Sequence, residues 1–172
     1  MKEIEMILPQ DIEKRSFEII EAELQQMNIV LPQEQEAITK RVIHTSADFS
    51  YAETMTYAEG AISHAIALLR GGAHIVTDTN MAKAGINKKT LARFGGEVHC
   101  FMADEAVAQE AKERGVTRAV VSMEHASHLP GHVIFAIGNA PTALIALHDM
   151  IDRKSTRLNS SHVALSRMPS SA

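Results

Sequence analysis

Apolar residues recur at helical spacing through the first third of the chain. Pro9 and Pro32 each begin a stretch in which apolar side chains are interspersed with charged and amide side chains. A third, alanine-rich stretch over 57–69 stops at Gly71 and Gly72, as is typical of a helix that ends on glycine. The pattern therefore predicts a helical N-terminal segment. Its apolar positions are Ile12, Phe17, Ile20 and Leu24 in the first helix, and Ala37, Ile38 and Val42 in the second.

After residue 72 the pattern changes to short apolar runs that alternate with helical segments. The runs at 73–76, 98–102 and 133–137 have the length and composition of buried strands. Strands that alternate with helices are typical of an α/β fold with a mostly parallel sheet and helices on both faces. We expect one such domain over 1–153. Its further helices are predicted over 87–94, from the cap Asp104 to Arg114, and over 117–129, where a strand at Val120 and Val121 is the alternative.

The third apolar run leads directly into a turn and a helix. Gly138 and Asn139 interrupt the run, Pro141 suits the first position of a helix, and 143–151 has helical apolar spacing. A strand that turns straight into a helix N-terminus directs backbone N–H donors at one place. In an open parallel sheet this is the edge at which ligands bind. We therefore expect a ligand site beside Asn139.

The last nineteen residues, 154–172, differ in composition from the rest. They contain six serines and no acidic residue, and they follow an amphipathic helix that carries Asp149 and Asp152. We interpret this segment as a non-native or disordered tail and leave it out of the fold prediction. Without its three basic residues, 14 Lys and Arg remain against 21 Asp and Glu, which gives a charge of −7.

The composition excludes several classes of function. The formal charge of −4 and the absence of Trp argue against a nucleic-acid-binding protein. No apolar run approaches the roughly 20 residues of a membrane span, and the charged N-terminus does not have the pattern of a signal peptide. The single cysteine, Cys100, forms no internal disulfide and fits the reducing cytoplasm, most simply as a buried thiol at a strand end.

Four segments together resemble the precorrin-8X methylmutase (precorrin isomerase) family of the cobalamin pathway. The resemblance extends from about residue 12 to residue 151. The segments are Arg-Ser-Phe-Glu-Ile-Ile at 15–20, Arg-Val-Ile-His-Thr-Ser-Ala-Asp-Phe at 41–49, Val-Thr-Asp-Thr-Asn-Met at 76–81 with Ala-Gly-Ile at 84–86, and Ala-Ile-Gly-Asn-Ala-Pro-Thr-Ala-Leu at 136–144.

The resemblance implies an isomerase that works without a cofactor. The family moves a methyl group from C11 to C12 of a corrin-type ring, and the product is hydrogenobyrinic acid, or cobyrinic acid in the cobalt-containing branch. The resemblance also implies a homodimer that binds the tetrapyrrole near the subunit interface. The histidine thought to protonate the ring system falls on His44. The family also continues past 143–151 with a further strand and a terminal helix, which this chain lacks, so an uncovered sheet edge is expected.

His44 is the predicted catalytic residue. It lies near the end of the helix that begins at Pro32, where the helix dipole favours a protonated imidazole, as suits a general acid. Asp48 is expected to orient the ring if the helix continues that far. The alternative is a histidine that only caps the helix.

The carboxylates of a corrin substrate require donors around the rim of a pocket. Each candidate taken alone is more often a cap or turn residue. Asp78, as an acid in a site for a polyanion, is expected to orient neighbouring donors and not to contact the substrate carboxylates. The predicted substrate-binding residues are Arg15, Ser16, Asp78, Thr79, Lys83, Thr117, Arg118, Asn139 and Thr142.

Two other functions are kept as alternatives. One is a corrinoid-binding protein without turnover. The other is a metalloenzyme built on His125, His128 and His132, whose spacing is a weak match to a zinc or cobalt site because no helical register brings all three together. We predict no metal site, and no role is assigned to His64, His74, His99 and His148.

Overall fold

The computed structural model describes residues 9–155 and 164–166. The chain divides into two compact units, residues 1–63 and residues 64–172. Each unit is described by itself. Within the described residues, no helix is both long and apolar enough to cross a membrane.

The first unit is helical, as predicted. It contains α1 (Pro9–Gln26), α2 (Gln33–Ser46) and the short α3 (Tyr51–Thr54). Ile20 and Leu24 of α1 pack with Ile43 of α2, and all three are buried. Partly buried apolar residues of α1, of the flanking loops and of α3 complete this cluster, among them Phe17, Ile29, Leu31, Phe49 and Tyr51.

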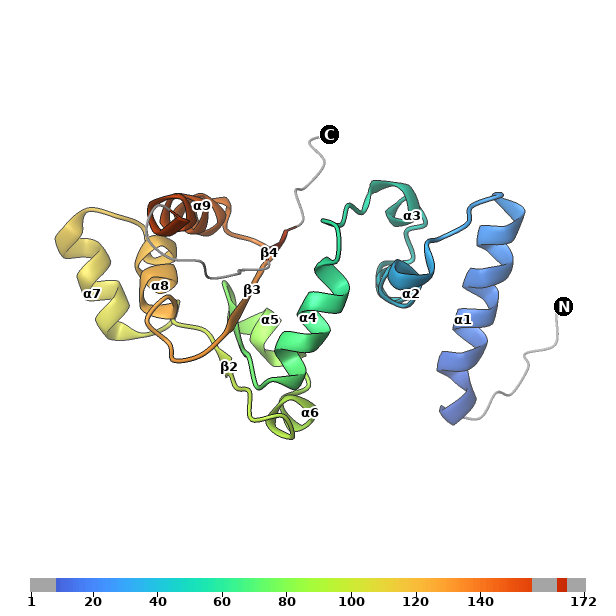
Figure 1. The fold of residues 1–172 in the computed structure, drawn as a ribbon, viewed down its shortest axis with the longest axis horizontal. Coiled ribbons are helices and arrows are strands. Elements are labelled where there is room, and N and C mark those ends of the chain that lie inside the picture. Colours follow the sequence, from blue (N-terminus) through green and yellow to red (C-terminus); the bar gives the residue numbers. More distant parts are fainter. Residues whose placement is uncertain (1–8, 156–163, 167–172) are drawn as a thin grey trace, which may run out of the picture. The chain divides into compact units, whose positions relative to one another are not determined.

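The chain passes from the first unit to the second within α4 (Ala61–Arg70). The second unit then alternates strands and helices (Figure 1). In chain order its elements are β1 (His74–Thr77), α5 (Asn80–Gly85), α6 (Lys88–Ala92), β2 (Val98–His99), α7 (Glu105–Arg114), α8 (Arg118–Ala126), β3 (Val133–Ile137), α9 (Pro141–Ser155) and β4 (Ala164–Ser166).

The strands of the described residues form one sheet in the order β2-β1-β3-β4, and every neighbouring pair is parallel. β1 and β3 form its centre, with His74 opposite Val133 and Thr77 opposite Ala136. Because these two strands are parallel and in register, their carboxyl ends meet at one edge of the sheet. Asp78 follows β1 there, and Gly138 follows β3.

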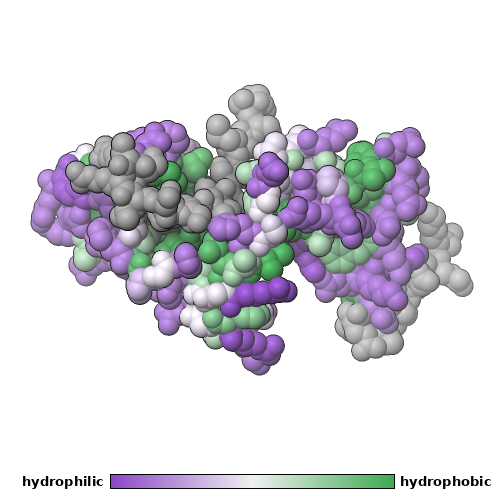
Figure 2. Space-filling model, in the orientation of Figure 1, coloured by the Kyte–Doolittle hydropathy of each residue, from purple (hydrophilic) through white to green (hydrophobic). Residues whose placement is uncertain are grey.

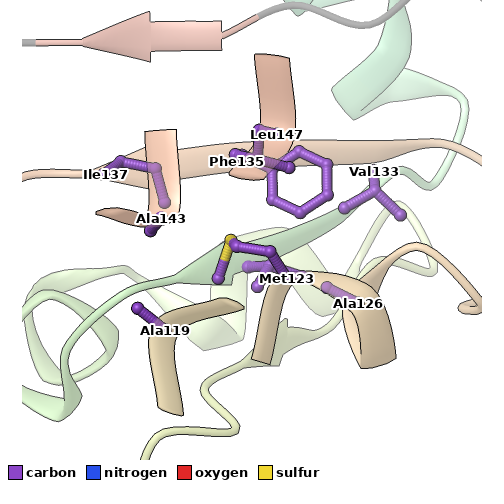
Figure 3. Packing of buried hydrophobic residues seen from close by; sticks show 9 residues of the cluster. Ala119, Met123, Ala126, Val133, Phe135, Ile137, Ala143 and Leu147 are labelled. Carbon is purple, nitrogen blue, oxygen red and sulfur yellow. The ribbon is translucent and has the colours of Figure 1, made fainter. Parts of the chain in front are cut away.

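Helices cover both faces of this sheet, which confirms the predicted architecture. On one face, Met123 and Ala126 of α8 and Leu147 of α9 pack against Phe135 of β3 (Figure 3). On the other face, Ile134 packs with Leu68 of α4 and with Ala73. Successive side chains of β3 point to opposite faces of the sheet, and helices cover both faces. This explains why 133–137 is an uninterrupted apolar run.

Several predicted boundaries are wrong. The helix expected over 57–69 begins at Ala61, because Gly60 has a φ of +67° that a helix does not allow. The strand expected over 98–102 is reduced to Val98 and His99. β1 pairs with it only at Ile75 and Val76, and the Thr77 hydroxyl then donates to the His99 carbonyl oxygen at 3.3 Å. The segment at 118–126 is helical, which excludes the alternative strand.

The helix caps are confirmed in part. Asp104 precedes α7 as predicted, but its side chain makes no capping hydrogen bond. Gly115 ends α7 in the left-handed conformation, with a φ of +64°. The helices α3 and α5 are not anticipated by the sequence pattern, since segments of four and six residues are too short for a periodic signal.

The segment 154–172 contributes one strand to the sheet. Residues 154–155 continue α9, and β4 pairs with β3 through Phe135, Ala136 and Ile137. The edge of β3, expected to be uncovered, is therefore paired. The residues at 156–163 and 167–172 lie outside the described residues, and the origin of the segment stays a prediction.

Candidate functional site

His44 lies in the last turn of α2, as predicted. The helix ends at Ser46, and Ala47 follows in the left-handed conformation with a φ of +55°. The imidazole is half-buried and stacks on the ring of Phe17 from α1, with ring centroids 5.3 Å apart and an interplanar angle of 27°. The Arg41 guanidinium lies over the same Phe17 ring at 4.9 Å from its centroid. Phe17 therefore fixes the imidazole against the helix pair.

Asp48 does not lie on the helix that carries His44, since α2 ends before it. Its Oδ1 accepts a 2.9 Å hydrogen bond from the Ser50 N–H, and its own N–H donates to Ser46 Oγ at 3.2 Å. The condition for Asp48 to orient the imidazole, a helix that continues to residue 48, is therefore not met. Asp48 instead organises the turn that leads into α3.

Arg15 and Ser16 lie on α1, directly before Phe17 in the sequence. We call the Phe17 ring, on which His44 stacks, the Phe17 platform. Arg15 is exposed and pairs with Glu18 at 3.1 Å, while Ser16 is half-buried. An exposed pair at this spacing contributes little to stability, so the Arg15 guanidinium remains available to a carboxylate ligand.

The turn between β3 and α9 is held by a buried carboxylate from β1. Asp78 is 1% exposed, and its Oδ2 accepts three backbone hydrogen bonds, from Gly138 at 3.2 Å, Asn139 at 2.6 Å and Ala140 at 2.8 Å. Three successive N–H groups that converge on one oxygen form an anion-binding nest. Here the anion is the protein's own side chain.

This arrangement corrects one expectation and agrees with another. The N–H donors before α9 were expected to face a ligand, but Asp78 Oδ2 already occupies three of them. The expectation that Asp78 orients neighbouring donors agrees with these contacts. Its second oxygen, Oδ1, is buried and has no hydrogen-bond partner in the described part of the chain.

The remaining candidates lie at helix starts of the second unit. Thr79 Oγ1 caps α5 by accepting from the Ala82 N–H at 3.1 Å, and Thr117 Oγ1 caps α8 by accepting from the Val120 N–H at 3.3 Å. Both hydroxyls therefore have a structural role already. Arg118, Asn139 and Thr142 are exposed at the starts of α8 and α9, and Lys83 is half-buried on α5.

His44 belongs to the first unit, as do Arg15 and Ser16, and the other predicted residues belong to the second. Within the second unit the structure brings Asp78 together with Asn139 through a direct hydrogen bond. Of the histidines of the metalloenzyme alternative, His125 and His128 line one pocket, whereas His132 is not part of its lining. His125 Nε2 lies within hydrogen-bond distance of Glu110 Oε2, at 2.9 Å, and His128 Nδ1 lies 2.8 Å from the Glu124 carbonyl oxygen, which accepts its hydrogen bond.

An ion-pair network links α7 to α8 around these histidines. Arg114 contacts Glu110 at 2.6 Å and Glu124 at 2.5 Å and 3.0 Å. The Arg114 guanidinium holds the pKa of Glu124 below its usual value, and His125, followed by Arg114, lowers the pKa of Glu110. Hydrophilic side chains cover α7 on the face shown in Figure 2. The Arg114 and Glu110 side chains are 41% and 37% exposed, so the network is partly solvated.

One cluster of histidines was missed in the sequence. His74 of β1 and His99 of β2 have their Nδ1 and Nε2 atoms 3.2 Å apart, although 25 positions separate them. No local spacing signals this contact, because it depends on the pairing of two parallel strands. The prediction of strands at 73–76 and 98–102 does not say that the two are neighbours, which only the structure shows.

The fold and these motifs agree with the comparison with known proteins. The family model described as precorrin-8X methylmutase matches residues 11–160. The chain therefore belongs to the precorrin-8X methylmutase family.

Individual relatives give the same result. The cobalt-precorrin-8 methylmutase of Priestia megaterium is 41% identical over 145 residues, which are 84% of this chain and 64% of that protein. The precorrin-8X methylmutase of Pseudomonas aeruginosa is 35% identical over 144 residues, which are 83% of this chain and 67% of that protein. The crystal structure of precorrin-8X methylmutase from Thermus thermophilus matches with a TM-score of 0.74 at 31% identity, over 84% of this chain and 69% of that one. The chain thus spans about two thirds of the length of these relatives.

Proposed function

We propose that the chain acts on a corrin-type tetrapyrrole as a precorrin-8X methylmutase. In this reaction a methyl group moves from C11 to C12 of precorrin-8X, or of cobalt-precorrin-8, and gives hydrogenobyrinic or cobyrinic acid. Membership of the family over residues 11–160 supports the proposal. The observation that carries it within the structure is the position of His44, half-buried in the last turn of α2 and stacked on Phe17.

His44 acts as the general acid in this proposal. A positioned proton donor typically contributes about 10²–10⁴ in rate. Protonation of the ring system eases the migration of the methyl group, and no cofactor is required. The Phe17 ring limits the orientations of the imidazole, so that the proton is delivered at one place.

The substrate carboxylates bind at cationic and polar side chains. Arg15, Lys83 and Arg118 supply positive charge, and Ser16, Asn139 and Thr142 supply uncharged polar groups. Asp78 does not bind the substrate in this proposal, because it is buried and holds the turn that presents Asn139. We also infer a homodimer whose subunit interface helps to enclose the tetrapyrrole, and a cytoplasmic location in keeping with the single cysteine.

The test is incubation of the full chain with the 8X intermediate while the visible spectrum is followed for the shift of the product. His44→Ala is expected to lower the rate of methyl migration by about 10²–10⁴ and to leave pigment binding unchanged. Thr45→Ala is the matched control, since Thr45 lies in the same turn and is exposed. Equal turnover by His44→Ala and the unchanged chain would refute the role of His44.

A corrinoid-binding protein without turnover is the second candidate. It is favoured by one observation, that the chain spans only 64% of the Priestia megaterium relative. Such a protein would bind the pigment and give no spectral shift, and His44→Ala would then have no effect. A version extended by the family's following strand and helix separates the cases, because turnover by the extended version alone would show that the added strand and helix are required.

A further inference from the structure

The residues that carry the further inference lie on β1, on β2 and directly before β2, outside the set proposed for the corrin substrate. His74, Glu97 and His99 each offer one ligand atom, and these atoms all lie within 4.8 Å of one another. We propose that this group binds a divalent transition-metal ion of the Zn²⁺ type through His74 Nδ1, His99 Nε2 and one oxygen of Glu97. The proposal does not depend on the reaction assigned above.

The distances between the ligand atoms fit a tetrahedral ion. His74 Nδ1 and His99 Nε2 are 3.2 Å apart, and His99 Nε2 is 3.9 Å from Glu97 Oε2. A four-coordinate ion with bonds of about 2.0–2.1 Å separates its ligand atoms by about 3.3 Å. The two imidazoles therefore already have the spacing of a bound pair. The carboxylate is 72% exposed and needs only a change of rotamer to close the third position.

The two histidines are held in place by the sheet. The His74 N–H donates to the His132 carbonyl oxygen at 2.9 Å, and the Ile75 N–H donates to the Glu97 carbonyl oxygen at 2.8 Å. The His99 ring stacks on Phe101, with centroids 6.0 Å apart and an interplanar angle of 6°. Ligands on paired strands lose little freedom when an ion binds, which favours affinity.

The charges beside His99 differ in sign. Lys83 lies close enough to His99 to disfavour a cation there. The Glu97 carboxylate offsets that charge. Two imidazoles and one carboxylate are a ligand set that Zn²⁺ accepts, with water at the fourth position.

A hydrogen bond between the two imidazoles is the competing explanation for the 3.2 Å contact. It needs no ion, and it gives Glu97 no part. The two explanations therefore differ in what Glu97→Gln does. This variant removes a charge from an exposed side chain, so the fold is retained and the result remains interpretable.

The experiment is calorimetric titration of the full chain with ZnCl₂ after treatment with a chelator. Binding of one equivalent is expected with a Kd of about 1–10 μM. Loss of a ligand is expected to weaken binding at least as much as loss of a group that only orients one, about 10–100-fold. His74→Ala should therefore weaken it by about 100-fold or more, and Glu97→Gln by about tenfold. Titration with CoCl₂ should give the intense visible bands of a tetrahedral Co²⁺ complex, absent in His74→Ala.

His148→Ala is the matched control. His148 is also a histidine beside carboxylates, 3.7 Å from Asp149 and 3.9 Å from Asp152, but it is exposed on α9. This variant should bind Zn²⁺ as the unchanged chain does. The proposal is overturned if no equivalent binds, if Glu97→Gln binds with unchanged affinity, or if His148→Ala loses the ion.

Discussion

The N–H of Asn139 donates a 2.6 Å hydrogen bond to Oδ2 of Asp78, across 61 positions of the sequence. The same oxygen accepts from Gly138 and Ala140, so one carboxylate at the end of β1 holds the whole turn that follows β3. The contact joins the two central strands of the sheet at their carboxyl ends. The Thr-Asp-Thr and Gly-Asn-Ala-Pro segments are far apart in the sequence, and this contact holds them together in the fold.

Removal of this carboxylate should destabilise the second unit. Asp78→Ala leaves three N–H groups without an acceptor, and we expect a loss of about 2–4 kcal/mol in the free energy of unfolding, since hydrogen bonds to charged groups are worth more than neutral ones. Asp78→Asn should cost about 1–3 kcal/mol. Its NH₂ group takes the place either of Oδ1, where it is buried without a partner, or of Oδ2, where it faces N–H donors. Urea unfolding measures both. Thr142→Ala, an exposed position in the same segment, is the control and should change stability by less than about 0.5 kcal/mol.

The two adjacent glycines after α6 should respond very differently to alanine. A Cβ at Gly96 would meet the Ala73 carbonyl oxygen and lie 2.9 Å from Leu91 Cδ1. Because the oxygen belongs to the backbone and cannot move aside, Gly96→Ala should cost about 3 kcal/mol. Gly95 has open space around it but a φ of +85°, so Gly95→Ala should cost only about 1 kcal/mol. Equal losses in the two variants would contradict this packing.

The ion pairs between α7 and α8 should make the free energy of unfolding depend on pH in the acidic range. Arg114 lowers the pKa of Glu124 in the folded state from the ordinary value of 4.5. A depressed carboxyl pKa contributes stability that is present above the ordinary value and is lost as the pH falls through the folded pKa. Arg114→Gln removes this contribution. Its deficit in unfolding free energy relative to the unchanged chain should be full above the ordinary pKa of 4.5 and should shrink as the pH falls below that value.

Lys112→Gln serves as the control for this experiment, since it removes the same charge from α7. It should show no comparable change of its deficit with pH. The Arg114→Gln deficit should also shrink as salt is added, because the pairs are partly exposed and are screened. A deficit that is constant from pH 7 to pH 3 would contradict the pKa shift of Glu124.

The parts of the fold that were predictable from the sequence carry strong local signals. β3, the Gly138 turn and the start of α9 at Pro141 were predicted to the residue, because an apolar run, a glycine and a helix-initiating proline occur in succession. α2 and the place of His44 in its last turn were predictable for the same reason.

The features that were not predictable depend on pairing between distant segments. β2 ends at His99, which lies opposite Val76 of β1, and no pattern within 98–102 indicates this pairing. The occupation of the turn N–H groups by Asp78, and the contact of His74 with His99, likewise require knowledge of which strands are neighbours. The residue types of the site were therefore recognisable, but the contacts that already engage them were not.

The Phe17 platform gives a last prediction, which concerns orientation and not acidity. Phe17→Leu keeps an apolar side chain against Ile20 and Leu24 but removes the ring on which His44 stacks. If His44 delivers the proton, kcat should fall by about tenfold or more, since misplacement of a catalytic group by about 1 Å can cost up to 10²-fold. Binding of the pigment should be unchanged. Arg41→Gln removes the cation over the same ring while leaving the His44 contact in place, so it should retain full kcat. Loss of kcat in Arg41→Gln equal to that in Phe17→Leu would assign the effect to the general packing of α1 on α2, and the orienting role of the ring would then be wrong.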